Sequence, residues 1–269
     1  MQRLKILFLG FITLLITSIG MLYFFQERLL FRSTKLPQDY SYHFDTDFQE
    51  LFLTAADGAA LNGIHFKQPN PKGILLYCHG NAGALDTWGK WAEELSNRYN
   101  YDVVVWDYRG YGKSLGKRRP ERMLDDGMLF YEYCKSHFKE TDMVLFGRSL
   151  GGFFATHLAV KNNPLKVILE STPTSILGIA EEQYPFLPSR LLLKYQFQND
   201  KNIERITNAS TYFIHGTHDD LVPYDHQKKL YKLSEAKVKK AFAIDEANHN
   251  DLVAFDTYFK VLDEIFEKL

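Results

Sequence analysis

Short apolar runs alternate with longer helical stretches along most of the chain, and this alternation constrains the fold more than any other feature. Buried strands are predicted over residues 74–78, 103–106, 143–146, 167–169, 212–214 and 242–244. Helices are predicted over residues 88–99, 122–137, 150–162, 225–233 and 251–269. Strands that are apolar on both sides and separated by helices indicate a mostly parallel central sheet with helices on both faces. Upstream, apolar runs at 51–54 and 61–66 flank Asp57-Gly58, which predicts a β-hairpin.

The N-terminal segment differs from the rest of the chain because residues 6–25 carry no charge and are almost wholly apolar. A helix of about 20 such residues spans the hydrocarbon core of a bilayer. We therefore predict a single-pass transmembrane anchor over 1–25, a linker over 26–45 and a catalytic domain over 46–269. A cleaved signal peptide is the alternative interpretation, since Ser18 and Gly20 could form a weak cleavage site.

The charges that flank this apolar segment favour neither orientation in the membrane. Arg3 and Lys5 precede the segment, and basic residues also follow it, beginning with Arg28. The expected localisation is thus a membrane, with the side of the catalytic domain left open.

Composition excludes one class of partner. The chain of 269 residues has 32 basic and 33 acidic residues, so it has no broad basic field that would collect nucleic acid. Its 45% hydrophobic content is enough to fill the core of one α/β domain. The only cysteines, Cys78 and Cys134, are expected to be buried, unpaired thiols.

The strongest local motif is GRSLG at residues 147–151, which follows a predicted strand and opens a predicted helix. This context is that of a nucleophile elbow, in which a tight turn exposes the serine hydroxyl at the edge of the sheet. The small neighbours Gly147 and Gly151 permit such a turn. Ser149 is therefore the predicted nucleophile.

A serine hydroxyl needs a base, and the base needs an acid that orients it. His249 lies between the last predicted strand and the last predicted helix, and Asp219 follows the preceding strand. The order serine, acid, histidine is that of α/β hydrolases. We favour Asp219 as the acid, with the adjacent Asp220 as the competing residue.

An oxyanion hole requires two backbone N–H donors. Leu150, directly after the nucleophile, would supply one donor. The loop HGNAG at residues 79–83 follows the first parallel strand, and within it Asn81 is the expected second donor. We interpret His79 as a structural brace of this loop.

With these motifs in place, the chain resembles the α/β-hydrolase superfamily, and within it the single-pass, membrane-anchored "alpha/beta hydrolase domain-containing" branch. The resemblance covers nearly the whole chain. It rests on residues 25–37, HGNAG at 79–83, DYRGYGKS at 107–114, GRSLGG at 147–152, and the segments 215–223 and 249–251.

The resemblance implies a serine hydrolase that cleaves carboxylic esters or acyl thioesters through an acyl-serine intermediate, without a cofactor. Lipid-like substrates are among those it implies. One departure is Asn248, where relatives usually have glycine before the histidine. Asparagine tolerates unusual backbone angles, so we expect little effect.

An apolar insertion at residues 172–205 interrupts the strand–helix alternation where such folds carry a cap. It could pack as extra core. Alternatively, it partly lines an acyl pocket over Ser149, since ligands bind beyond the strand ends of such sheets. The residues predicted to line that pocket are Ile176, Ile179, Phe186, Leu187 and Leu191.

The sequence also admits other interpretations. An amidase or peptidase could use the same triad, and the fold could also serve as a binding module with an idle triad. Gly112-Lys113-Ser114 resembles a phosphate-binding loop, but the required glycine is replaced by Asp107. The cluster at 215–220 lacks a distant ligand, so no metal is expected.

Overall fold

The computed structural model describes residues 2–267, and its centre is an eight-stranded sheet with the order β1-β2-β4-β3-β5-β6-β7-β8. The pairs β1/β2 and β2/β4 are antiparallel, and all other neighbours are parallel, which confirms the predicted sheet. The strands are β1 Phe48–Thr54, β2 Ala60–Phe66, β3 Ile74–Cys78, β4 Asp102–Trp106, β5 Met143–Arg148, β6 Lys166–Glu170, β7 Ser210–Gly216 and β8 Lys239–Ile244.

Helices cover both faces of this sheet, so each central strand is buried on both sides. In β3, Ile74 and Leu76 belong to one core and Leu75 and Tyr77 to the other, as the two-residue period of a strand requires. The first core is closed by α3 Pro120–His137, α4 Gly151–Lys161 and α8 Asp225–Leu233. The second is closed by α2 Leu85–Tyr99 and α9 Asp256–Glu267.

The hairpin near the start of the domain agrees with the sequence prediction, whereas the start of the last helix does not. The predicted hairpin is present, with Thr54 paired to Ala60 across the turn. The last helix begins later than predicted, because a 3₁₀ turn η2 Leu252–Ala254 separates the His249 loop from α9. The Asp251 carboxylate accepts a hydrogen bond from the Asn248 N–H at 2.6 Å, so this stretch forms a turn and no helix. The predicted residues 268–269 lie outside the described part of the chain.

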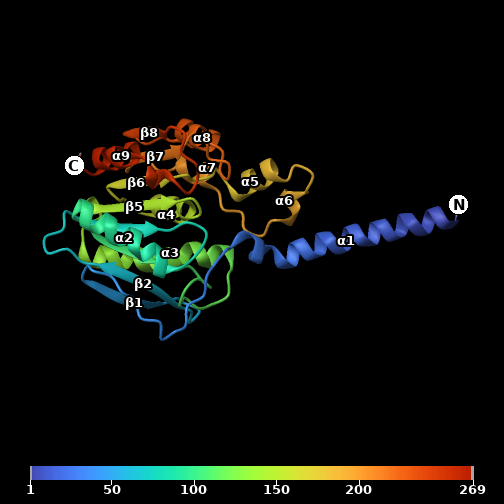
Figure 1. The fold of residues 1–269 in the computed structure, drawn as a ribbon, viewed down its shortest axis with the longest axis horizontal. Coiled ribbons are helices and arrows are strands. Elements are labelled where there is room, and N and C mark those ends of the chain that lie inside the picture. The colour runs from blue at the N-terminus through green and yellow to red at the C-terminus, as the bar shows by residue number, and fades with distance from the viewer. Residues whose placement is uncertain (1, 268–269) are drawn as a thin grey trace.

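The insertion at 172–205 contains three short helices, α5 Ile176–Gln183, α6 Ser189–Leu192 and α7 Asn199–Ile203. Figure 1 shows α5 and α6 standing out from the body, beside the base of the N-terminal helix. A short 3₁₀ turn, η1 Glu140–Asp142, precedes β5.

The N-terminal helix α1 Gln2–Leu30 projects away from the body (Figure 1). By length and composition it is able to cross a membrane, and the body of the protein does not bury its apolar stretch. It continues into the segment expected to be a linker, because residues 26–30 are good helix formers without glycine or proline. The helix therefore extends beyond the apolar run to the edge of the domain.

The residues that follow α1 are fixed to the domain. The N–H of Thr34 donates to the Gly83 carbonyl at 3.0 Å, and the N–H of Leu36 donates to the Gly112 carbonyl at 3.0 Å. Phe31 is buried against Tyr195, with ring centroids 4.8 Å apart. The chain between the helix and the domain is therefore held by specific contacts over residues 26–36.

Candidate active site

Ser149 occupies a strained turn between β5 and α4. Its φ is 51°, in the left-handed region that non-glycine residues rarely adopt. The surroundings enforce this turn: a Cβ on Gly151 would lie 1.8 Å from the Cys78 carbonyl oxygen, and a Cβ on Gly147 would lie 2.6 Å from the Gly152 Cα. Backbone contacts therefore require the small residues on either side of the serine.

The structure brings together the three residues predicted to form a triad. The Ser149 Oγ lies 3.1 Å from His249 Nε2, and His249 Nδ1 lies 2.7 Å from Asp219 Oδ2. All three side chains are largely buried, with exposed fractions of 9%, 4% and 6% for Ser149, His249 and Asp219. Asp220, the competing acid, is exposed at the surface.

The environment of Asp219 favours its ionised form. Its Oδ1 accepts hydrogen bonds from the N–H groups of Leu221 at 3.0 Å and Val222 at 2.7 Å. Its Oδ2 also lies 3.2 Å from His215 Nε2. Burial acts to raise the pKa of Asp219, but the hydrogen bonds from His215, His249 and Val222 outweigh it and hold the pKa below its ordinary value.

Sequence reasoning missed the part played by Arg148, the residue before the nucleophile. Its Nη2 donates to the carbonyl oxygen of His249 at 3.0 Å, and its Nε lies 3.1 Å from Glu170 Oε1. Glu170 in turn accepts a hydrogen bond from the Tyr258 hydroxyl at 2.6 Å. Arg148 thus holds the backbone of His249 in place. A charged residue at the end of an otherwise apolar, buried strand is the sequence feature that could have indicated this role.

The loop that carries His249 does not depend on glycine at the preceding position. The N–H of His249 donates to the Asn248 side-chain oxygen at 2.6 Å. Asn248 is not among the described residues with positive φ, so asparagine at this position, in place of glycine, causes no backbone strain.

The loop at residues 79–83 after β3, which carries the predicted oxyanion donor Asn81, is braced from both sides. His79 is fully buried between Trp88 and Tyr108, its Nδ1 donates to the Gly80 carbonyl at 2.7 Å, and its carbonyl accepts from the Tyr108 hydroxyl at 2.6 Å. This is the structural role predicted for His79. In the described part of the chain, the N–H groups of Asn81 and Leu150 have no protein acceptor. Both groups are therefore free to bind a developing negative charge.

The Asn81 side chain connects this loop to the end of α1. Its Oδ1 accepts from the Arg32 N–H at 3.0 Å and from the Tyr111 hydroxyl at 2.7 Å. Its Nδ2 donates to the Leu30 carbonyl at 2.6 Å. The candidate oxyanion donor is thus held in place by the residues in which the N-terminal helix ends.

The side chains predicted to line an acyl pocket differ widely in exposure, and the pocket itself stays a prediction. Phe186 and Leu191 are 98% and 83% exposed, and Leu187 is 37% exposed, so all three side chains are largely open to solvent. The short helix α6 is tied to α1, since Gln26 Nε2 donates to the Leu192 carbonyl at 3.1 Å. Of the predicted set, Ile176 packs against the core and Ile179 is half-buried.

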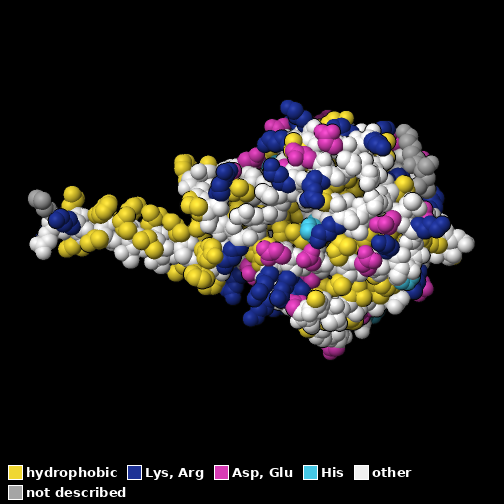
Figure 2. All heavy atoms as spheres, turned by 180° about the vertical axis from the view of Figure 1, so that it is seen from behind, with side chains coloured by type: hydrophobic (Ala, Val, Ile, Leu, Met, Phe, Trp, Pro, Cys, Tyr) yellow, Lys and Arg dark blue, Asp and Glu magenta, His cyan; other side chains and the backbone are white. Residues whose placement is uncertain are grey.

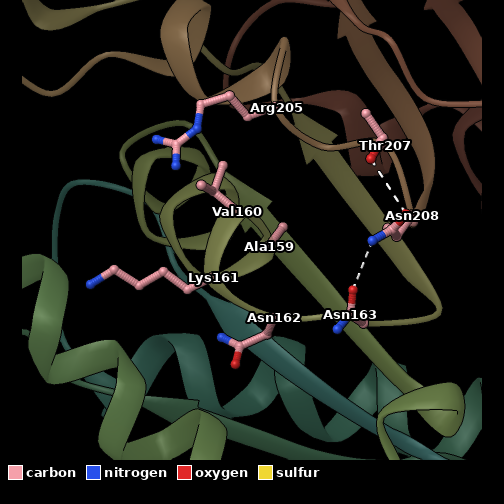
Figure 3. A pocket seen from close by; sticks show the side chains of 9 residues that line it. Ala159, Val160, Lys161, Asn162, Asn163, Arg205, Thr207 and Asn208 are labelled. Atoms are coloured by element: carbon pink, nitrogen blue, oxygen red, sulfur yellow. Dashed lines mark hydrogen bonds between the residues drawn. The ribbon is translucent and has the colours of Figure 1, made fainter.

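A small hollow elsewhere is unrelated to this site. Figure 3 shows it at the C-terminal end of α4, with Lys161, Asn162 and Arg205 around it. Its volume is about 100 Å³, and Asn208 Nδ2 donates to Asn163 Oδ1 at 2.9 Å beside it. Because α4 is 11 residues long, this hollow lies about 16 Å along the helix axis from the N-terminal end of α4, which directly follows the Ser149 turn.

A mostly parallel eight-stranded sheet with a nucleophile elbow after β5 and a histidine after β8 defines the class of α/β hydrolases. Comparison with solved structures agrees with this class. The esterase Pf2001 of Pyrococcus furiosus superposes with a TM-score of 0.68 at 18% identity, covering 88% of this chain and 97% of that one. A soluble variant of monoglyceride lipase from Saccharomyces cerevisiae superposes with a TM-score of 0.66 at 16% identity, covering 86% and 98%.

Sequence comparison identifies the branch. A family model described as serine aminopeptidase, S33, matches residues 69–176. The membrane protein YNL320W of Saccharomyces cerevisiae is 30% identical over 96% of this chain and 95% of its own length. Protein bem46 of Schizosaccharomyces pombe is 28% identical over 91% and 87%. The chain therefore belongs to the α/β-hydrolase family, in the branch whose hydrolase domain follows one N-terminal apolar helix.

Proposed function

We propose that the protein is a membrane-anchored serine hydrolase that cleaves carboxylic esters or acyl thioesters through an acyl-serine intermediate. The observation that carries this proposal is the buried series of hydrogen bonds from Ser149 through His249 to Asp219. The roles are nucleophile for Ser149, general base for His249 and orienting acid for Asp219.

In the first step, the Ser149 hydroxyl oxygen attacks the carbonyl carbon of the substrate while His249 Nε2 accepts the hydroxyl proton. Asp219, which is ionised, accepts a hydrogen bond from His249 Nδ1 and so keeps Nε2 available as the acceptor. The negative charge that develops on the carbonyl oxygen would be bound by the free N–H groups of Leu150 and Asn81.

Collapse of the tetrahedral intermediate expels the alcohol or thiol, which takes the proton from His249. A water molecule then repeats the sequence on the acyl-serine and releases the acid and free Ser149. A peptidase or amidase reaction is the second candidate, because the matching family model is described as a serine aminopeptidase. An amine leaves less readily than a thiol, so this alternative needs full proton donation by His249.

We also infer that α1 is a membrane anchor and that residues 46–269 form the catalytic domain with 172–205 as its cap. The length and apolar composition of α1 support a membrane span, and a relative over nearly the whole chain is named a membrane protein. The flanking charges give no orientation.

The test uses the full chain in detergent, labelled with a fluorophosphonate probe and assayed on p-nitrophenyl esters, acyl thioesters and aminoacyl anilides. Ser149→Ala should abolish labelling and lower kcat by about 10⁶-fold. Ser136→Ala is the matched control, since that exposed serine bonds only to its own helix end. Labelling that persists in Ser149→Ala would disprove the assigned nucleophile, and turnover of anilides alone would favour the peptidase.

A further inference from the structure

The molecule has a wide basic hollow where α1 meets the domain. Its volume is about 810 Å³, and it is formed by the end of α1, the segment after it and the loop before α3. Although the whole chain has a net charge of −1, six cations line this hollow. They form what we call the basic hollow: Arg28, Arg32, Lys35, Lys117, Arg118 and Arg119.

None of these six cations forms an ion pair with an acidic side chain of the described residues. Arg118 builds the wall, since its guanidinium donates to the Ser33 hydroxyl at 2.7 Å and to the Arg109 carbonyl at 2.8 Å. The other five are exposed, and none forms an ion pair with a described residue. The one acidic side chain in the lining, Glu27, accepts a hydrogen bond from the Tyr195 hydroxyl at 2.9 Å.

Mutual repulsion among these like charges is relieved when an anion is bound, so the hollow attracts anions. Figure 2 shows Lys and Arg side chains gathered directly at the base of the apolar helix. These cations come from segments about 90 residues apart in the sequence, so the fold itself assembles the charge.

The basic hollow lies directly after the apolar run of α1, and this position limits which anions can reach it. The apolar run of α1 ends in Tyr23, Phe24 and Phe25, and aromatic residues mark the interfacial ends of membrane-spanning helices. Arg28 follows Phe25 by less than one helical turn, about 4.5 Å along the axis. If α1 spans the bilayer, the hollow therefore lies at the depth of the lipid headgroups.

We propose that the basic hollow binds the anionic headgroups of phospholipids in the leaflet from which α1 leaves the membrane. The shared chemistry is a phosphate monoanion or diester held by several Arg and Lys side chains. A soluble phosphate has the same chemistry, but only a lipid is delivered at this depth by the helix that forms the wall. The proposal rests on α1 being a membrane span and is independent of the assigned catalytic residues.

The test uses the full chain in dodecyl maltoside, titrated with phosphatidylglycerol or with phosphatidylcholine of the same acyl chains. The apparent Kd is taken from the rise in melting temperature, since a ligand that binds the folded state stabilises it. The test variant is Arg32→Gln/Lys117→Gln/Arg119→Gln. Each neutralised cation should weaken binding about 5-fold, so the triple variant should bind phosphatidylglycerol on the order of 100-fold more weakly.

The matched control is Lys90→Gln/Lys232→Gln/Lys237→Gln, which removes the same charge from exposed positions outside the hollow. The control should bind phosphatidylglycerol as the wild type does, and raising NaCl should weaken the binding. Equal affinity for the two lipids, or an unchanged affinity in the test variant, would overturn the proposal.

Two further measurements keep the result decisive. Glycerol 3-phosphate binding as tightly as phosphatidylglycerol would show a site for a soluble phosphate and refute the lipid assignment. If the triple variant unfolds, Lys35→Gln/Lys117→Gln replaces it, because both side chains are exposed. That double variant should lose about 25-fold in affinity, and no loss would again refute the proposal.

Discussion

Replacing Asp219 with asparagine is the sharpest test of the proposed mechanism, because the structure dictates how the new amide must lie. Two backbone N–H groups, from Leu221 and Val222, point at Oδ1 of the native carboxylate. Turning an amide nitrogen toward them would leave the buried Val222 donor and the partly buried Leu221 donor without their acceptor, at a cost of about 1–3 kcal/mol for the buried donor alone. The amide oxygen must therefore occupy the Oδ1 position, with the NH₂ group at the position of Oδ2.

At that position the NH₂ group faces His249 Nδ1, which lies 2.7 Å from Oδ2 in the native protein. The ring then has to accept at Nδ1 and carry its proton on Nε2. In that tautomer His249 donates to Ser149 and is unable to accept the hydroxyl proton. We expect Asp219→Asn to lower kcat by about 10⁴-fold while the fold is retained.

The assay is the rate of fluorophosphonate labelling together with kcat on a p-nitrophenyl ester, with the melting temperature as the measure of folding. Asp220→Asn is the control and should stay within about 2-fold of the wild type, because Asp220 is exposed and surface changes act weakly. A loss below about 10-fold for Asp219→Asn, or a larger loss for Asp220→Asn, would refute the assignment of the acid.

Further predictions concern the oxyanion loop, the elbow, the anchor and the thiols. Asn81→Ala should lower kcat by about 10-fold to 100-fold with little change in KM, because it removes three hydrogen bonds that position the loop, as ester kinetics will show. Gly151→Ala should destabilise the fold by about 3 kcal/mol or prevent folding, measured by denaturant unfolding, since its Cβ would meet the Cys78 carbonyl oxygen at 1.8 Å. The full chain should resist carbonate extraction, and a soluble product with its N-terminus near Met21 would show cleavage instead. Burial raises the pKa of the Cys78 thiol to about 12, so mass spectrometry should find it unalkylated by iodoacetamide at pH 8 until the protein is unfolded.

The sequence was sufficient to predict the sheet and the three residues that meet at its edge. Strands that are buried on both faces have a pattern that few other elements share, and GRSLG at 147–151 admits little besides a tight turn. Ser149, Asp219 and His249 follow from their places after β5, β7 and β8, because the carboxyl ends of parallel strands lie along one edge.

Contacts between segments that are distant in the chain could not be predicted from the sequence. The exposure of Phe186 depends on how the segment around α6 packs beside α1, and apolar composition alone does not distinguish a buried side chain from an exposed one. The bond from Arg148 to the His249 carbonyl likewise joins two loops whose separation is known only once the sheet has formed. The helix α1 continues past the apolar run to Leu30, and apolarity alone does not indicate where such a helix ends.

The junction between α1 and the domain has a consequence for how the enzyme would meet its substrates. The segment from Gln26 to Leu36 is hydrogen-bonded to the cap, to the loop at residues 79–83 and to the loop after β4. These bonds restrict rotation of the domain relative to α1. If α1 spans a bilayer as proposed, an active site on such a junction keeps a nearly constant height and tilt above it. Encounters with molecules that diffuse within the membrane plane would then be two-dimensional, and the rate would depend on their surface density. Molecules dissolved in the surrounding water would have to approach through the one face that this fixed tilt leaves open.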